Sequence, residues 1–179
     1  MKKQAMPFFL FIILTLLLLG SGAQAVDITL FAPTTAQVYF SPEGGCTDAI
    51  LKAISHARSE ILIQAYSFLS PSIAQALIVA HRRGVKVELI LDKSERQEGL
   101  TPPTEMANAG IPVYLDAVHA IANNRIIIID HKTIITGSFN FNKTSEEMNA
   151  ENLLILQTEA LAKIYRDNWL KHRMHSESF

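Results

Sequence analysis

Residues 123–140 read NNRIIIIDHKTIITGSFN, and this stretch decides how the fold is interpreted. Two β-prone runs, 125–130 and 133–136, flank a His-Lys pair at 131–132. Apolar runs separated by so few polar residues are typical of antiparallel strands joined by a tight turn. The stretch therefore predicts a β-hairpin, with a further turn beginning at Gly137.

Strand-like and helix-like segments alternate along the rest of the chain. The expected strands lie at 36–40, 60–68, 85–91, 111–115 and 153–156. The expected helices lie at 49–57, 70–84, 144–147 and 161–169, and 99–109 is expected to be a Pro-broken loop that enters a short helix. Alternation of this kind is typical of α/β proteins. We expect an α/β sandwich with helices flanking a mixed, mostly parallel central sheet.

The amino end has the order of a secretory signal peptide. Two lysines precede an uninterrupted apolar run at 8–19, and small residues end at Ala25. The run is shorter than the roughly 20 residues that span a bilayer, which favours cleavage over a retained anchor. We expect cleavage after Ala25 and a secreted or periplasmic domain at 26–179, with an uncleaved membrane tether as the alternative.

Length and composition limit the remaining possibilities. A chain of 179 residues is large enough for one domain with a sizeable core. The formal net charge is −1, and no lysine-rich arm is present, so any grip on a polyanion must be local. Cys46 is the only cysteine, which excludes an internal disulfide. A small buried residue is its simpler interpretation.

The 123–140 stretch resembles the signature of the phospholipase D superfamily. That signature has a His, a Lys two residues later and an Asp five beyond, followed after six residues by Gly-Ser-x-Asn. Four positions match it: Asp130, Gly137, Ser138 and Asn140. Two depart from it, because Asn123 takes the His position and Arg125 the Lys position. The resemblance covers essentially all of 26–179, and small secreted bacterial endonucleases with a single motif copy are similar in length and element order.

The resemblance implies a mechanism and an assembly. In this superfamily the motif His attacks phosphorus, and the His of a second motif copy acts as the acid. No metal or other cofactor is required by that scheme. Single-motif members obtain the second copy by forming a two-fold dimer, which would bring two copies of 123–140 face to face. The implied substrates are nucleic acid, as first choice, or a phospholipid.

Carried over position by position, the resemblance also implies roles for individual residues. Asp130 would support the site electrostatically, and Glu151 would brace the nucleophile position at Asn123. Three residues would bind phosphate oxygens: Arg125, Ser138 and Asn140. Arg125 keeps the positive charge of the family's Lys, although its planar guanidinium has a different shape.

Asn123 is the serious departure, because a carboxamide neither titrates near neutrality nor attacks phosphorus. Loss of a catalytic nucleophile costs on the order of 10⁴ to 10⁶ in rate in hydrolases. Three interpretations follow. The chain is a phosphodiesterase with lost or reduced activity, a pseudoenzyme that binds phosphodiesters without cutting them, or an active enzyme in which Asn123 and Arg125 are introduced changes.

Two histidines near the motif are candidates to replace the missing imidazole. His119 lies four residues before Asn123, and His131 directly follows Asp130. A surface or turn position is the simpler interpretation of both, with His119 the better candidate if its segment is a loop. The remaining histidines show no metal-ligand spacing, and no metal site is expected; they are His56, His81, His172 and His175. Phe139 and Phe141 are expected to pack in the core rather than to stack on a base.

Overall fold

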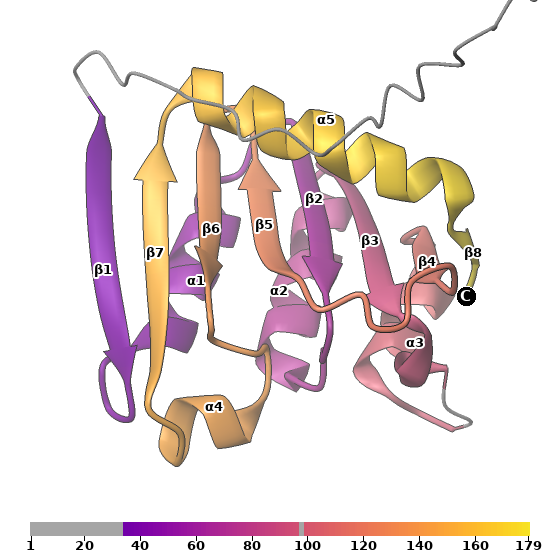
Figure 1. Cartoon of the computed structure of the whole chain (residues 1–179), viewed down its shortest axis with the longest axis horizontal. Coiled ribbons are helices and arrows are strands. Elements are labelled where there is room, and N and C mark those ends of the chain that lie inside the picture. Colours follow the sequence, from indigo (N-terminus) through magenta and orange to yellow (C-terminus); the bar gives the residue numbers. More distant parts are fainter. Residues whose placement is uncertain (1–33, 97–98) are drawn as a thin grey trace, which may run out of the picture.

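The central element of the fold is one eight-stranded sheet (Figure 1). The computed structural model describes residues 34–96 and 99–179. The strands are β1 (Thr35–Ser41), β2 (Glu60–Ala65), β3 (Lys86–Asp92), β4 (Val113–Asp116), β5 (Arg125–Ile129), β6 (Thr133–Gly137), β7 (Glu151–Gln157) and β8 (Glu177–Ser178). Across the sheet their order is β1-β7-β6-β5-β2-β3-β4-β8. The expected signal segment at 1–25 lies outside the described residues.

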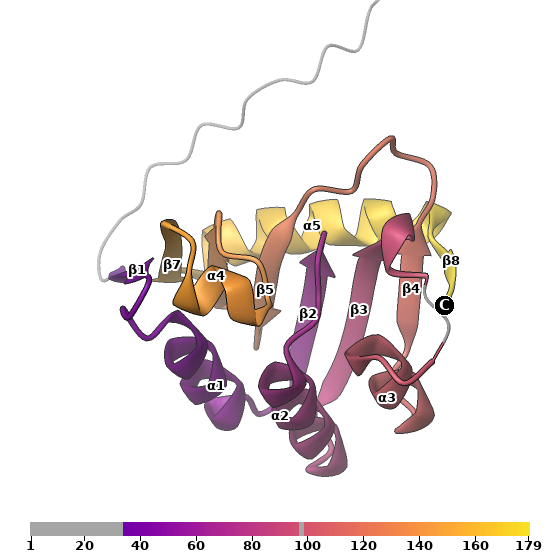
Figure 2. The same ribbon diagram turned by 90° about the horizontal axis from the view of Figure 1, so that it is seen from below.

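Helices cover both faces of this sheet. They are α1 (Cys46–His56), α2 (Pro71–Arg82), α3 (Pro102–Asn108), α4 (Lys143–Glu147) and α5 (Glu159–His175), with a 3₁₀ turn at Lys93–Glu95. Figure 2 shows α5 on one face and α1, α2 and α3 on the other. Within the described ranges, no helix combines the length and the apolar character that a membrane crossing requires.

The predicted α/β class with a mixed sheet flanked by helices is confirmed, but the expected predominance of parallel pairing is wrong. Among the strands of the described ranges, only β2–β3 and β3–β4 pair in parallel. The other neighbours in the sheet are antiparallel. Parallel neighbours need a long crossover, and in this sheet α2 and α3 supply the two crossovers. The chain then reverses direction from β4 to β5, at the β5–β6 turn and, through the link that contains α4, from β6 to β7.

The hairpin predicted at 125–136 is formed by β5 and β6, with Ile126 opposite Thr136. Asp130 and His131 have φ angles of 50° and 58°. Positive φ at both central residues is typical of the tight hairpin turns whose twist matches that of the strands. Strand β5 places Arg125 and Asp130 at opposite ends of the strands. We call these two rows of strand ends the two edges of the sheet, so Arg125 lies at one edge and Asp130 at the opposite edge.

The core fills both sides of the sheet. Large aliphatic side chains from the central strands pack against α1, α2 and α3, and burial of each such side chain contributes about 1.5–3 kcal/mol. On the other face Trp169 of α5 is 2 % exposed, and its indole Nε1 donates a hydrogen bond to the Ile63 carbonyl at 2.8 Å. Phe139 and Phe141 are buried, which confirms their expected core packing. Cys46 is also buried, and burial and nearby Glu146 raise its pKa to about 11.

Candidate active site

Arg125 stands at the centre of the candidate site, at the first position of β5. Its Nε donates to Asn140 Oδ1 at 2.7 Å, and its Nη1 donates to Asn123 Oδ1 at 2.9 Å. The guanidinium carbon lies 5.9 Å from the centre of the Tyr66 ring. A guanidinium has five N–H donors, so these two bonds leave donors for a phosphate. Three of the predicted site residues are therefore joined in one cluster, which we call the Arg125 cluster: Asn123, Arg125 and Asn140.

Ser138 belongs to the turn that follows β6, as predicted. A side chain at Gly137 would place its Cβ 2.2 Å from the Asn152 carbonyl oxygen, so only glycine fits there. That carbonyl accepts the N–H groups of Ser138 and Phe139 at 3.1 and 3.2 Å. Ser138 Oγ accepts from the backbone N–H and the Nδ2 of Asn152 at 3.1 and 3.2 Å. These bonds leave the hydroxyl hydrogen of Ser138 available for a ligand.

Glu151 begins β7 near the same edge. Its Oε1 accepts a hydrogen bond from Asn149 Nδ2 at 3.0 Å. Its backbone N–H donates at 3.3 Å to Ser41 Oγ, which in turn donates to the Asn149 carbonyl at 2.9 Å. The Glu151 carboxylate is thus held by its own turn. Its expected role in bracing Asn123 stays a prediction.

Asp130 does not belong to this cluster, which corrects the expectation that it supports the site electrostatically. It lies five residues beyond Arg125 along an extended strand, a rise of about 16 Å. Its carboxylate accepts the backbone N–H groups of Arg58, Ser59 and Glu60 at 2.9, 2.7 and 3.1 Å. The Ser59 hydroxyl also donates to it, at 2.8 Å. Asp130 therefore fixes the start of β2 at the far edge of the sheet.

The charge of Asp130 follows from these bonds. Burial disfavours the carboxylate, but the donors of Ser59, Glu60 and Arg58 outweigh burial and lower the pKa of Asp130 below its ordinary value. A hollow of about 400 Å³ beside Asp130 is lined by Lys52, Arg58 and Lys132 among others. That hollow is at the opposite edge from Arg125, so we do not assign it to the motif chemistry.

Comparison with known proteins identifies the family. Residues 50–173 match the family model described as "Cardiolipin synthase, PLD-like domain". The chain belongs to the phospholipase D-like family. A Rickettsia conorii protein named phospholipase D is 42 % identical over 147 residues, which cover 82 % of this chain and 74 % of the relative. A canine mitochondrial cardiolipin hydrolase is 28 % identical over 120 residues, which cover 67 % of this chain and 47 % of the relative.

Two solved structures share this fold. The chain is similar to Nuc from Salmonella typhimurium, a phospholipase D family member, with 34 % identity and a TM-score of 0.77. The match covers 82 % of this chain and 99 % of Nuc. NucT from Helicobacter pylori matches with a TM-score of 0.76 over 82 % of this chain and all of NucT, at 24 % identity. The second likeness concerns the fold alone.

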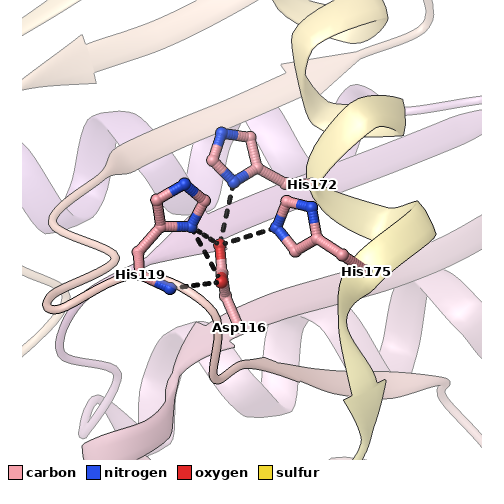
Figure 3. A group of neighbouring side chains, drawn as sticks. All are labelled: Asp116, His119, His172 and His175. Atoms are coloured by element: carbon pink, nitrogen blue, oxygen red, sulfur yellow. Dashed lines mark hydrogen bonds and ion pairs between the residues drawn. The ribbon is translucent and has the colours of Figure 1, made fainter.

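The two histidines considered as replacements lie away from the Arg125 cluster of this phospholipase D-like domain. His131 Nδ1 is 3.4 Å from Glu60 Oε2, at the Asp130 edge. His119 Nδ1 is 2.9 Å from both carboxylate oxygens of Asp116, on the side of α5 (Figure 3). Each imidazole thus has a carboxylate partner elsewhere. The placement argues against either histidine as a substitute for the missing nucleophile.

The sequence interpretation missed two features of this edge. Asn152 positions the Ser138 turn through both its backbone and its side chain. Three histidines gather around Asp116, and two of them lie on α5, far along the chain from the third. The paired spacings Asp-x-x-His at 116–119 and His-x-x-His at 172–175 carry the signal that would have found this group.

Proposed function

We propose that this chain is an exported phospholipase D-family phosphodiesterase whose hydrolysis of phosphodiester bonds is lost or strongly reduced. The single observation that supports it is the hydrogen bond from Arg125 Nη1 to Asn123 Oδ1. The carboxamide is oriented toward the cation that would bind phosphate, at the position that the family resemblance gives to the nucleophile. Hydrogen-bond donors for a phosphate are present here, but the family's attacking group is absent.

Hydrolysis of a phosphodiester needs a nucleophile in line with the leaving oxygen, an acid to protonate that oxygen and donors for the other oxygens. Arg125, Ser138 and Asn140 are suited to the third task, because each retains a donor. Asn123 cannot perform the first two. In a symmetric dimer the same defect occurs twice, so nucleophile and acid are lost together.

The second candidate is a phosphodiester-binding pseudoenzyme, and the guanidinium of Arg125 favours it. Two carboxamide oxygens hold the cation in place, and its remaining N–H groups suit a phosphate. The resemblance to small endonucleases puts nucleic acid first as the ligand. Relatives named phospholipase D and cardiolipin hydrolase make a phospholipid the second choice. Both ligands present the phosphodiester that the cluster would bind.

A homodimer with the cluster at its two-fold interface is part of the proposal. Exposed apolar side chains gather near this edge: Phe40 is 64 % exposed, Ile121 59 % and Met148 77 %. Phe40 pairs with Asn152, which holds Ser138, and Ile121 lies two residues before Asn123. Exposed apolar side chains gathered on one surface are typical of surfaces that a second chain covers. In sedimentation experiments Ile121→Asp should dissociate the dimer, whereas Leu100→Asp, at a position 84 % exposed, should not.

Export is proposed from the sequence of 1–25, which has the order of a cleavable signal peptide. The full chain expressed in a bacterium should appear outside the cytoplasm with Val26 as its first residue, as measured by mass spectrometry. Retention of residues 1–25 on a membrane-bound product would instead support the tether.

The decisive experiment incubates residues 26–179 with DNA, RNA and a phosphatidylcholine analogue, beside the double variant Asn123→His, Arg125→Lys. Cleavage only by the variant would support a dead site on an intact scaffold. Cleavage by the unmodified chain would overturn the proposed loss of activity. Binding of an uncleavable phosphodiester by the unmodified chain would support the pseudoenzyme.

A further inference from the structure

A cluster of four metal-ligand side chains lies at the end of β4, on the side of the sheet covered by α5 (Figure 3). We call it the His3Asp cluster, and its members are Asp116, His119, His172 and His175. One candidate ligand atom from each residue lies within 4.8 Å of every other. The motif chemistry uses none of the four.

Two local patterns create the cluster. Asp116 ends β4, and His119 follows three residues later in the loop that leads to β5. His172 and His175 are three apart on the last turn of α5, so they lie on one face of the helix. Because α5 crosses the sheet toward β4, as Figure 1 shows, its carboxyl end brings both histidines to Asp116.

The imidazoles converge on one buried carboxylate. Asp116 Oδ2 lies 2.8 Å from His172 Nδ1, 2.9 Å from His119 Nδ1 and 3.4 Å from His175 Nε2. The three rings contact one another, with centroid distances of 4.9, 5.2 and 5.3 Å. The Asp116 side chain is fully buried, whereas that of His119 is 44 % exposed. The cluster is therefore closed toward the sheet and open to solvent at His119.

Three imidazole nitrogens and one carboxylate oxygen form a ligand set that suits a tetrahedral Zn²⁺. Zinc–ligand bonds of about 2.0–2.1 Å put the ligand atoms of a tetrahedron roughly 3.4 Å apart. The widest pair in the cluster would therefore have to approach by roughly 1.4 Å, which is within the reach of a side-chain rotation. The negative charge of Asp116 offsets part of the charge of the ion.

We propose that the His3Asp cluster binds a divalent transition metal ion, with Zn²⁺ as the best fit, and that the ion fastens the carboxyl end of α5 to β4. The sequence spacing of the histidines predicted no metal site, and this proposal replaces that prediction. The His3Asp cluster is separate from the Arg125 cluster. Across the sheet, Arg125 pairs with Ala65, Ala65 pairs with Leu91, and Leu91 pairs with Leu115, the residue before Asp116. These three strand spacings place Arg125 about 14 Å from Leu115.

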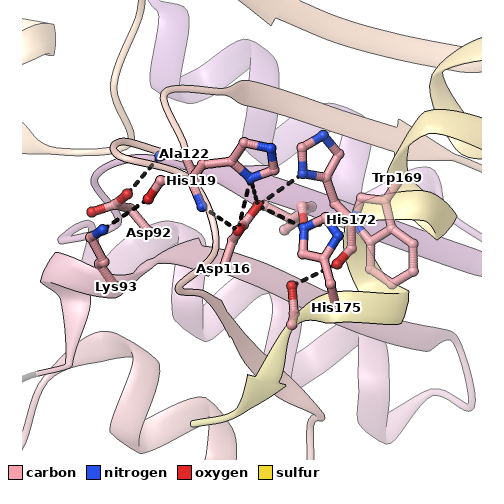
Figure 4. Close-up of polar contacts among 10 residues, drawn as sticks. Asp92, Lys93, Asp116, His119, Ala122, Trp169, His172 and His175 are labelled. Atoms are coloured by element: carbon pink, nitrogen blue, oxygen red, sulfur yellow. Dashed lines mark hydrogen bonds and ion pairs between the residues drawn. The ribbon is translucent and has the colours of Figure 1, made fainter. Parts of the chain in front are cut away.

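The ion would stabilise the region where the carboxyl end of α5 and strand β8 meet β4. The edge strand β8 follows α5 directly and pairs with β4 over only two residue pairs. The loop that carries His119 continues to Asn123, and Figure 4 shows two of the contacts that hold it. Lys93 Nζ donates to the His119 carbonyl at 2.8 Å, and the Ala122 N–H donates to Asp92 Oδ2 at 2.6 Å. A bound ion would add a further anchor to this loop.

The test uses the full mature chain without a histidine tag, stripped with a chelator and titrated with Zn²⁺ and Co²⁺. We expect one ion per chain, a tetrahedral Co²⁺ absorption spectrum and a rise in Tm of about 5–10 °C at a hundredfold excess of Zn²⁺ over Kd. His119→Ala and His172→Ala should each weaken binding by at least about 10- to 100-fold, because loss of a ligand should cost no less than loss of an outer-shell partner. His56→Ala removes an exposed histidine elsewhere and should leave the affinity unchanged.

The alternative is a metal-free network of hydrogen bonds around Asp116. In that case the stripped chain keeps its Tm when Zn²⁺ is added, and the Co²⁺ spectrum is that of the hydrated ion. Either result would overturn the proposal. Equal affinity in the wild type and in His119→Ala would also overturn it. Because His119 lies in an exposed loop, we expect this variant to fold, and circular dichroism can verify that it does. None of these measurements depends on phosphodiester chemistry.

Discussion

The two ends of strand β5 differ in how fully their polar groups are satisfied by the protein. At one end the Asp130 carboxylate accepts three backbone N–H groups and one hydroxyl. At the other end the Arg125 guanidinium donates to two carboxamides and retains further donors. Both residues match, or nearly match, one short family motif. Of these two motif residues, only Arg125 has donors left for a ligand.

This difference separates binding from stability within a single motif. A group whose hydrogen bonds are all made inside the protein contributes to folding, and its removal leaves its partners unpaired. A group that keeps free donors at an exposed edge can exchange water for a ligand. Substitutions at the Arg125 end should therefore change ligand chemistry, and substitutions at the Asp130 end should change the free energy of unfolding.

The largest expected effect comes from restoring the family's residues at the Arg125 end. Asn123→His with Arg125→Lys supplies a nucleophile and a compact cation, and it should raise phosphodiester cleavage by at least about 10³-fold, given the cost of losing a nucleophile in hydrolases. Initial rates with a chromogenic phosphodiester measure the change. Asn124→His with Arg125→Lys places the same imidazole one residue away and should stay inactive. Equal rates in the two variants would show that Asn123 is not the nucleophile position.

A smaller effect is expected from removing the cation. Arg125→Ala should weaken binding of an uncleavable phosphodiester by about 10- to 100-fold, because hydrogen bonds to charged groups contribute about 1.5–3 kcal/mol. Calorimetric titration measures the affinity. Arg58→Ala removes an exposed arginine at the far edge and should leave it unchanged. If both variants bind equally weakly, general charge attraction rather than the cluster holds the ligand.

At the other end, Asp130→Ala should lower the free energy of unfolding by about 1–3 kcal/mol without weakening phosphodiester binding. The pKa of Asp130 is lowered in the folded state, so the carboxylate stabilises the fold above its unfolded pKa of about 3.9, and this contribution falls as the pH drops below that value. Urea titrations of the wild type and of Asp130→Ala at several pH values measure the difference in their free energies of unfolding. A stability difference that grows toward acid pH would contradict this sign.

Much of the fold was predictable, because local chemistry specifies it. Ser70 was expected to begin a helix, and its Oγ accepts the Ile73 N–H at 3.4 Å. The β5–β6 hairpin follows from its two apolar runs. The direction of strand pairing did not follow, because it depends on which connections cross the sheet. β4 and β5 are consecutive in the chain and yet are separated by β2 and β3.

The site was predictable in part for the same reason. Arg125 and Asn140 belong to one hairpin and its turn, so the motif brings them together. Asp130 belongs to the same motif, but the extended strand carries it to the opposite edge, and spacing alone does not reveal this. The His3Asp cluster depends on where α5 ends over the sheet. That position is a property of packing, with Trp169 buried against β2, rather than of sequence spacing.

The smallest expected effect tests whether Ser138 contributes mainly to stability, like Asp130, or to ligand binding, like Arg125. Its Oγ accepts two hydrogen bonds from Asn152, which is itself exposed, so water can replace the lost acceptor. Ser138→Ala should therefore cost only about 0.5–1 kcal/mol in the free energy of unfolding. The same variant should weaken phosphodiester binding about 2- to 5-fold, through loss of one neutral donor. Unchanged affinity together with a larger loss of stability would make Ser138, like Asp130, a residue of the fold rather than of the site.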